Sequence, residues 1–446
     1  RLLLIPLYHD NIWDIWGRLA YKKRKMKISF KNKYRIQTSV LLLFVFMQFS
    51  SVAQIKTDSI VTCAVKSLPD IFKKRDSIQV IKPTKNSFFL IIPIIGIQPA
   101  NGFMYGAVAQ YTFKGKSIID KYSSVNLGAT HTTKNQLLIN LKNNLILNNN
   151  KIYLSGDWRY YIFSQGNFGL GTDIIPRDRK NTDFQFEAIE EPMKYNYFKF
   201  HQTISFQVIK NLYVGSGLHI DGYTDIEDQN LDIENNKFTN HYNYSNKYGF
   251  TDKEYYVNGL SFNMVFDSRD NQVNTNSGWF ANINYRVNPE IGRNQKSSQV
   301  LFSEYRYFIP LSKTNFQHVL AFWTYGQFLI GGNVPYLNLP AIGWDQRSRG
   351  GKGYTQGLFR GFNLMYFGTE YRFPISCNKL FSGTIFSNFT TASNKENNIK
   401  LFQYVQPAVG LGLRILIDKP TRTNIIANYG WGRNSEAFYL NAGETF

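Results

Sequence analysis

The stretch that decides the fold runs from residue 331 to residue 375 and reads GGNVPYLNLPAIGWDQRSRGGKGYTQGLFRGFNLMYFGTEYRFPI. Its first part, through residue 362, is a long glycine-rich segment with several cations and no acid after Asp345. Its second part alternates with the two-residue period of a β-strand, which places Glu370 and Arg372 on one face and Tyr371 on the other. Such a strand suits a wall between lipid and a polar lumen, and the basic segment beside it is able to fold back onto carboxylates in that lumen.

The composition of the whole chain favours a transmembrane β-barrel. Of its 446 residues, 43% are hydrophobic and 16% are aromatic, yet no apolar run reaches the roughly 18 to 20 residues that a membrane-spanning helix needs. Abundant Tyr and Phe without such a run fit a barrel with aromatic girdles, and a soluble β-sandwich is the alternative. The formal net charge is +20. No basic run interleaves with aromatic residues, so nucleic acid is not an expected partner.

The first 87 residues look like processing signals and a tail. Residues 1–25 precede Met26 and are interpreted as upstream sequence that is not translated. Residues 26–53 have the basic, apolar and small-residue regions of a signal peptide, with cleavage before Gln54. Residues 54–87 form a short polar periplasmic tail, which we expect to be flexible or only loosely docked. We therefore expect export and a location in the outer membrane of a Gram-negative bacterium.

From residue 88 to residue 446 the chain is a series of alternating segments separated by turn residues. The number of segments is even, and short connections alternate with a set that contains the long ones, as in outer-membrane barrels. The sequence thus predicts an all-β, 16-stranded antiparallel transmembrane β-barrel at 88–446, with a long outer loop folded inward. The long connections are 164–194, 225–254 and 331–362. The predicted strands are 88–98, 102–113, 121–132, 134–147, 150–163, 195–209, 211–224, 255–268, 278–288, 297–309, 315–330, 363–374, 379–391, 402–417, 421–432 and 436–446.

Several motifs resemble those of the BamA/TamA superfamily, the bacterial surface antigen barrels. Residues 357–360 (GLFR) and 370–374 (EYRFP) are similar to the end of the family's sixth outer loop and to the strand that follows it. The family's loop-tip triplet is Arg-Gly-Tyr or Arg-Gly-Phe, whereas Lys352, Gly353 and Tyr354 have lysine in the first place. Arg360 begins a literal match to the triplet but lies almost against the strand. This position favours Lys352 as the tip cation of the implied latch, with Arg360 as the alternative.

The resemblance also assigns roles outside the loop. It implies that Glu370 and Arg372 are the lumen partners of the latch, and its second acidic partner is missing from residues 385–390. It implies a tight periplasmic hairpin, in which acids accept backbone N–H groups and glycine permits positive φ. The hairpin residues are Asp267, Arg269, Asp270 and Gly278. The last strand resembles the signal that barrel-assembly machinery reads, carried by Phe438, Leu440 and the terminal Phe446.

The implied function is assistance in the insertion or translocation of proteins at the outer membrane. The family resemblance implies a weak seam between 88–98 and 436–446, where Pro93 and Pro99 each remove a hydrogen-bond donor. An opened seam exposes strand edges that pair with an incoming strand. The tail 54–87 is too short for the POTRA modules of relatives. A passive or accessory barrel is the alternative: a pore, a lipid-handling protein or a surface antigen.

Motifs for chemistry are absent from the sequence. Neither H-E-x-x-H nor G-x-S-x-G occurs, so we predict no catalytic residue, no metal and no cofactor. The expected partners are outer-membrane lipid and lipopolysaccharide, with nascent outer-membrane proteins or a separate periplasmic protein. Cys63 and Cys377 are expected on the same side of the membrane, either as a disulfide or as two independent thiols. The sequence names neither a client nor an oligomeric state.

Overall fold

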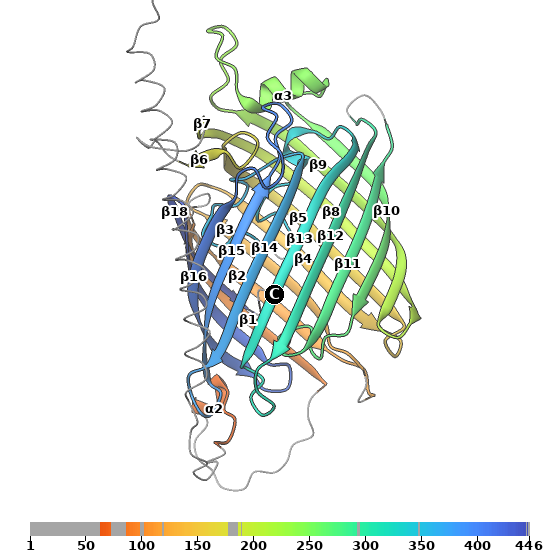
Figure 1. Ribbon diagram of the computed structural model, residues 1–446, viewed down its shortest axis with the longest axis vertical. Coiled ribbons are helices and arrows are strands. Elements are labelled where there is room, and N and C mark those ends of the chain that lie inside the picture. The colour runs from red at the N-terminus through yellow and green to blue at the C-terminus, as the bar shows by residue number, and fades with distance from the viewer. Residues whose placement is uncertain are drawn as a thin grey trace, which may run out of the picture. The chain divides into compact units, whose positions relative to one another are not determined.

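Sixteen antiparallel strands form one sheet that makes up most of the structure, a computed structural model (Figure 1). The structure describes residues 63–72, 86–98, 102–117, 120–176, 186–188, 190–291, 295–346, 348–442 and 444. Segments 1–25 and 26–53 lie outside these described residues. The strands of the sheet are β1 (Ser87–Gln98), β2 (Gly102–Phe113), β3 (Ser123–Thr132), β4 (Leu137–Leu147), β5 (Ile152–Asn167), β8 (Glu191–Ile209), β9 (Leu212–Asp228), β10 (Tyr255–Asp267), β11 (Gly278–Asn288), β12 (Ser298–Pro310), β13 (Val319–Gly332), β14 (Asn363–Pro374), β15 (Phe381–Ala392), β16 (Gln406–Asp418), β17 (Thr423–Gly432) and β18 (Ser435–Ala442).

Each strand of the sheet is hydrogen-bonded to the next in this order, including β5 to β8. The connection between β5 and β8 contains two further short strands. There, β6 (Ile174–Pro176) and β7 (Phe186–Ala188) form a separate parallel pair. The predicted all-β, 16-stranded antiparallel fold is confirmed. Among the predicted boundaries, 195–209 was too short because the strand begins at Glu191, and 436–446 was too long because β18 ends at Ala442.

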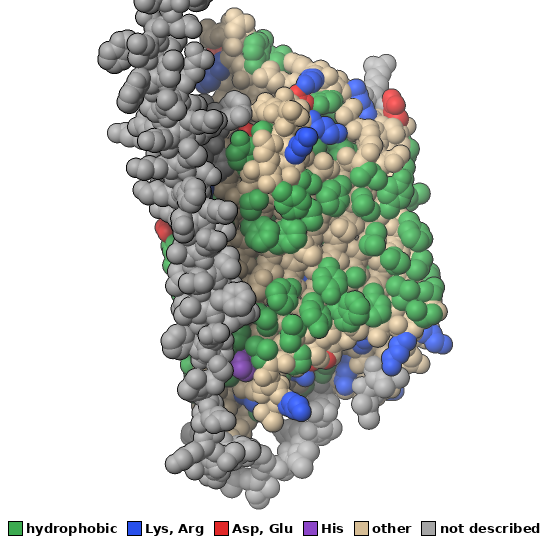
Figure 2. Space-filling view, viewed as in Figure 1, with side chains coloured by type: hydrophobic (Ala, Val, Ile, Leu, Met, Phe, Trp, Pro, Cys, Tyr) green, Lys and Arg blue, Asp and Glu red, His purple; other side chains and the backbone are tan. Residues whose placement is uncertain are grey.

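Alternation along the strands sorts the side chains between an outer face and a lumen. In β10, Leu260 and Phe262 are exposed on the outer face, whereas Ser261 and Asn263 are buried on the inner face. Figure 2 shows hydrophobic side chains spread over the middle of the wall, with Lys and Arg gathered toward its upper and lower rims. An apolar band between charged rims is what a barrel needs to cross a bilayer. The sheet is therefore the wall of a transmembrane β-barrel.

The connections are short at one end of the wall and long at the other. Short turns use residues that tolerate positive φ, such as Asn149 between β4 and β5 and Asn211 between β8 and β9. The long connection between β9 and β10 contains α3 (Asn240–Tyr248), which Thr239 caps and Gly249 ends at φ 66°. Within the described ranges, no helix has the length and apolar character required to span a bilayer.

Residues 63–72 are docked against the short turns, so the prediction of a loose tail was wrong for this part of it. A disulfide joins Cys63 to Cys377 in the β14–β15 turn, and the Lys66 N–H donates to the Asn378 carbonyl at 2.9 Å. The helix α2 (Leu68–Phe72) follows, and Asp70 pairs with Lys419 at 2.8 Å. Partial burial raises the pKa of Asp70, but hydrogen bonds from Lys419 and Ser67 outweigh it and hold this pKa well below its usual value.

The buried apolar residues gather inside the barrel. One cluster joins the walls of β5, β8, β9 and β10 to Tyr336 and Phe362 of the β13–β14 connection. A second cluster joins the walls of β12 to β16 to Tyr354 and Phe359 of the same connection. This connection therefore occupies part of the lumen and forms the centre of the packed core, since apolar contacts surround it on two sides.

Candidate functional site: the lumen loop and the strand seam

The β13–β14 connection turns into the barrel, and we call residues 333–362 the lumen loop. It opens with the short 3-10 helix η2 (Tyr336–Asn338). Tyr336 is fully buried and donates its hydroxyl to the Asn167 side chain at 2.6 Å. Tyr223 of β9 donates to the Leu337 carbonyl at 3.3 Å. The first part of the loop is thus tied to the wall on the β5–β9 side. Arg347 lies outside the described residues.

The tip of the lumen loop brings Lys352 to the inner face of β14. The Lys352 Nζ lies 3.2 Å from a carboxylate oxygen of Glu370, and the two side chains are 4% and 0% exposed. The Asn388 side chain of β15 donates to the Lys352 carbonyl at 3.0 Å. The ammonium also lies 4.3 Å from the centre of the Phe386 ring, close enough for a cation–π contact. We call the Lys352–Glu370 pair the latch.

Gly353 permits a backbone-to-backbone contact between the tip and the wall. Its φ is +101°, and a Cβ there would lie 3.0 Å from the backbone nitrogen of Gly432 and 3.0 Å from the carbonyl carbon of Trp431. On the wall, a Cβ at Gly430 would lie 2.8 Å from the Gly353 nitrogen. Any side chain at either position would push the loop off the wall, so this close approach requires glycine on both sides.

Tyr354 and its neighbour extend the contact of the tip as far as the last strand. The Tyr354 hydroxyl donates to the Pro407 carbonyl at 2.6 Å and accepts from the Arg433 N–H at 2.9 Å. The Gly353 N–H donates to the hydroxyl of Tyr439 in β18 at 3.0 Å. Three consecutive loop residues therefore hold the wall from β14 to β18.

Arg360, the other candidate for the tip cation, has a different place. Its side chain is 4% exposed, and Nη1 donates to the carbonyls of Tyr336, Leu337 and Leu339 at 3.1, 2.8 and 3.3 Å. These acceptors all belong to the lumen loop, so Arg360 closes the loop on itself. Lys352 is the loop cation that reaches Glu370.

A second buried acid stands beside the latch, although residues 385–390, where the resemblance places such an acid, carry none. Glu444 accepts from Arg414 Nε at 2.9 Å and from the Asn424 amide at 2.7 Å. Arg414 also pairs with Glu370, and Arg372 lies 2.8 Å from Glu370 and 3.5 Å from Glu444. Glu444 follows the end of β18 at Ala442, and its carboxylate pairs with Arg372 and Arg414. Glu444 thus ties the end of the last strand to the latch.

The hairpin between β10 and β11 also reaches into the barrel. Asp267 accepts from the backbone and side chain of Arg269, and Asp270 accepts from the N–H groups of residues 276 and 277. Gly278 has a φ of +99°. Arg372 Nη1 donates to Asn274 Oδ1 at 3.3 Å and to the Thr275 carbonyl at 3.2 Å. The hairpin therefore meets the latch cluster from the opposite end of the lumen.

The seam lies between the two edge strands of the sheet, β1 and β18. Parts of these strands have Cα atoms within 8 Å of each other, yet over the residues that the structure describes no ladder joins them. β18 has 8 residues and β1 has 12. Phe438 is 40% exposed, and Phe446 is outside the described residues. The two edge strands are close together, but in the described residues their backbone N–H and C=O groups form no ladder of hydrogen bonds.

A comparison with protein families decides the identity of this barrel. The Omp85 superfamily domain matches residues 193–446, more than half of the chain. The chain belongs to the Omp85 superfamily. It is accordingly a protein of the Gram-negative outer membrane. No curated protein matches the sequence.

Two solved structures are similar to this Omp85 barrel. BamA from Haemophilus ducreyi, lacking POTRA domains 1–3, aligns with a TM-score of 0.50 and 14% identity over 80% of this chain and 69% of that chain. CdiB from Acinetobacter baumannii aligns with a TM-score of 0.47 and 13% identity over 80% of this chain and 59% of that chain. At such low identity the BamA match supports the fold alone.

Sequence reasoning found part of the Omp85 site and missed the rest. The structure brings Lys352, Glu370 and Arg372 together, as the resemblance implied. It adds Arg414 and Glu444, which were not assigned to the latch. Arg414 carried a signal, because it is the one charged residue on the inner face of the alternating run 407–415. Glu444 carried none, because alternation places it on the same face as Phe438.

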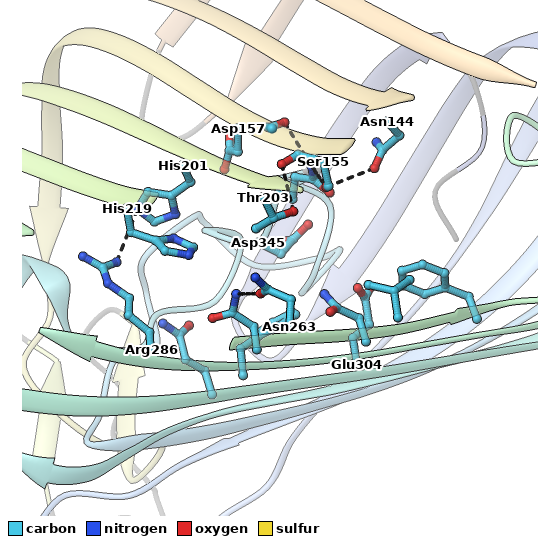
Figure 3. A pocket seen from close by; sticks show the side chains of 18 of the residues that line it. Asn144, Ser155, Asp157, His201, Thr203, His219, Asn263, Arg286, Glu304 and Asp345 are labelled. Carbon is cyan, nitrogen blue, oxygen red and sulfur yellow. Dashed lines mark hydrogen bonds between the residues drawn. The ribbon is translucent and has the colours of Figure 1, made fainter. Parts of the chain in front are cut away.

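Beneath the lumen loop of the Omp85 barrel lies a polar cavity of about 200 Å³ (Figure 3). His201 and His219 stand side by side there, with ring centres 4.5 Å apart, near Arg286. The cations of the lining have carboxylate partners: Lys199 with Asp157, Arg269 with Asp267, Arg286 with Asp221 and Arg306 with Glu304. No metal-binding cluster of His, Cys, Asp or Glu is found in the described part of the chain.

Proposed function

We propose that this Omp85 barrel assists the insertion of other β-barrel proteins into the outer membrane by pairing their strands at the seam. The observation that carries this proposal is the proximity of β1 and β18 without a ladder in the described residues. Each unpaired N–H or C=O group of a strand edge in lipid costs several kcal/mol, about as much as any buried polar group without a hydrogen bond. An incoming strand would satisfy these groups by β-augmentation.

The contacts of the lumen loop support a barrel that opens on one side of the seam. The loop holds the β14–β18 wall through the latch at 3.2 Å and through Tyr354 at 2.6 Å. By contrast, its hydrogen bond to β4, from Lys142 Nζ to Ser348 Oγ, is 3.4 Å long. A bond of that length is weak. The β18 edge is thus braced, and we infer that the β1 edge moves.

The alternative of a passive pore finds less support. The lumen loop binds Glu370 through Lys352, the β10–β11 hairpin binds the neighbouring Arg372, and Glu370 and Arg372 pair at 2.8 Å. An open channel would need one of these segments to withdraw at the cost of its buried hydrogen bonds, about 1–3 kcal/mol for each group left unsatisfied. In planar bilayers, we expect the wild-type barrel to conduct far less than an open porin of 16 strands. Porin-like steady conductance would favour the pore.

Targeting and partners belong to the same proposal. We propose that residues 26–53 are a cleaved signal peptide, that residues 54–87 stay in the periplasm, and that a separate periplasmic protein delivers the incoming chains. The disulfide between Cys63 and Cys377 supports this compartment, because disulfides persist in oxidising environments. The outer band of the wall is proposed to contact membrane lipid and lipopolysaccharide. No catalytic step is proposed.

The test is an insertion assay with a seam that can be locked. The Cys63→Ser, Cys377→Ser background removes the natural disulfide, and Ile92→Cys with Asn441→Cys places one thiol on each edge strand. Liposomes carrying this barrel receive a urea-denatured eight-stranded barrel, and its folding is followed as a heat-modifiable gel band. We expect several-fold faster folding than in empty liposomes, loss of this gain on crosslinking, and its return on reduction. Equal folding with the seam locked and unlocked would contradict the proposal. A deletion strain profiled for other outer-membrane barrels tests it in cells.

A further inference from the structure

A second cavity, of about 280 Å³, lies at the seam itself, and we call it the seam cavity. Its volume is close to the lower end of the range of about 300–1,000 Å³ for small-molecule sites. Its lining includes Ile92 and Pro93 of β1 and Leu440 and Asn441 of β18. Consecutive residues of a strand point to opposite faces. The cavity is therefore bordered by both the lipid side and the lumen side of each edge strand.

Part of the lining of the seam cavity is apolar. Ile92, Met104, Val108 and Leu138 contribute it, among polar residues such as Gln110 and Asn126. β1 is unusual for a barrel strand, because Leu90 and Ile92 of its inner face are as apolar as Phe89 and Ile91 of its outer face. A polar lumen gives no reason for this second apolar face. An aliphatic chain lying against it would bury that surface at about 25 cal/mol per Å².

The lining of the seam cavity also carries two cations, Lys142 and Arg349. Among the described residues, Glu444 is its one acid. The Glu444 carboxylate already pairs with Arg414 and Arg372. Over the described residues, Lys142 Nζ has no carboxylate within 4.0 Å, and its hydrogen bond to Ser348 is 3.4 Å long. Asp157 and Asp345 attract Lys142 from beyond ion-pair distance, and Asp157 is also held by Arg159 and Lys199.

The charge balance separates this cavity from the polar cavity of Figure 3, where each lining cation has a carboxylate partner. Lys142 is half-buried and has no carboxylate at ion-pair distance among the described residues, so an anion placed beside it would gain a direct partner. We propose that the seam cavity binds an anionic lipid, with the acidic head group at Lys142 and Arg349 and the aliphatic chain along Ile92, Met104 and Val108. The chain would leave between β1 and β18 into the bilayer.

This site is independent of the proposed insertion activity, and its test measures bound lipid alone. The full barrel is placed in nanodiscs of phosphatidylglycerol or of phosphatidylcholine, released into detergent, washed and examined by native mass spectrometry. We expect one phosphatidylglycerol to remain bound, and phosphatidylcholine to be retained about tenfold less. In a separate arm, oleate is added to the detergent-purified barrel. Displacement of the phospholipid by oleate would assign the site to a free fatty acid, and resistance to oleate would assign it to a phospholipid head group.

Matched variants identify the two halves of the site. Lys142→Gln is expected to lower retention about tenfold, the change expected for loss of one charge-assisted hydrogen bond. Lys142→Arg should retain the lipid. The control is Lys151→Gln, which changes an exposed lysine of the β4–β5 turn. Val108→Trp keeps the charge and fills the apolar half, so it should also lose the lipid while remaining heat-modifiable. Equal retention of the two phospholipids, equal retention by Lys142→Gln and the wild type, or no retained molecule would overturn the proposal.

Discussion

Glu370 and Glu444, one on β14 and the other just beyond the end of β18, share the guanidinium groups of Arg372 and Arg414. Glu370 alone also accepts Lys352 from the lumen loop. The two acids therefore have different roles. Glu370 binds the lumen loop to the wall, and Glu444 binds the end of the last strand to the same arginines. Their side chains are almost fully buried, so removing either leaves the buried cations with one carboxylate fewer.

Glu370→Gln should lower the stability of the folded barrel by about 3–5 kcal/mol, because three buried cations then lose one carboxylate. The measurement is the temperature at which the compact band unfolds on a semi-native gel. Glu290→Gln, an exposed change on an outer connection, is the matched control and should behave like the wild type. If the two variants unfold at the same temperature, the latch does not stabilise the barrel.

Glu444→Gln should act mainly at the seam. The amide cannot neutralise Arg414, so we expect the end of β18 to leave the lumen and its backbone to open more often. Hydrogen exchange should therefore speed up in residues 435–442, with little change in β10. Uniformly faster exchange across the barrel would mean that Glu444 contributes to global stability rather than to the attachment of the last strand.

Gly353→Ala should detach the tip of the lumen loop. Alanine at φ +101° is strained by about 1–3 kcal/mol, and its Cβ would meet the backbone of Trp431 and Gly432 at 3.0 Å. Limited proteolysis at Lys352 should then be faster than in the wild type. Gly331→Ala is the control, because Gly331 has ordinary φ and faces only the flexible Gln299 side chain. Comparable protease resistance in both variants would mean that the backbone of Trp431 and Gly432 moves to make room for the new Cβ, and the prediction would be wrong.

Reduction of the disulfide should release the docked segment 63–72. The surface pair of Asp70 with Lys419 is worth only about 0–1 kcal/mol, so α2 has little else to hold it once Cys63 is free. Trypsin should then cleave after Lys66 much faster with reductant than without it, while the barrel band stays compact. Cys377→Ser should show the fast rate under both conditions. A slow rate in that variant would mean that the hydrogen bonds of the segment suffice.

The fold could be predicted from the sequence because the alternation of residues and the lengths of the connections indicated the same architecture. Period-two alternation marked the strands, and the lengths of the connections marked the two ends of the barrel. β10 illustrates this, since its predicted span of 255–268 differs from Tyr255–Asp267 by one residue. The hairpin that follows was also visible, because Asp270 and Gly278 are residues that tight turns require.

The parts that escaped prediction depend on contacts between distant segments. Alternation continues in the sequence from Phe438 to Glu444, so local reasoning keeps Glu444 on the outer face. Only the charges of Arg372 and Arg414, far away in the chain, draw it inward. The distance of Lys352 from the strand favoured it over Arg360 as the latch cation, but the place of Arg360 was beyond local pattern. The carbonyls that bind Arg360 are brought together only by the path of the lumen loop.

The disulfide between Cys63 and Cys377 spans 314 positions of the chain and encloses every strand from β1 to β14. The bond therefore joins the segment before the first strand to the turn after β14, across this whole part of the barrel. A time course of non-reducing gels would show when these two distant segments become joined, without any added probe.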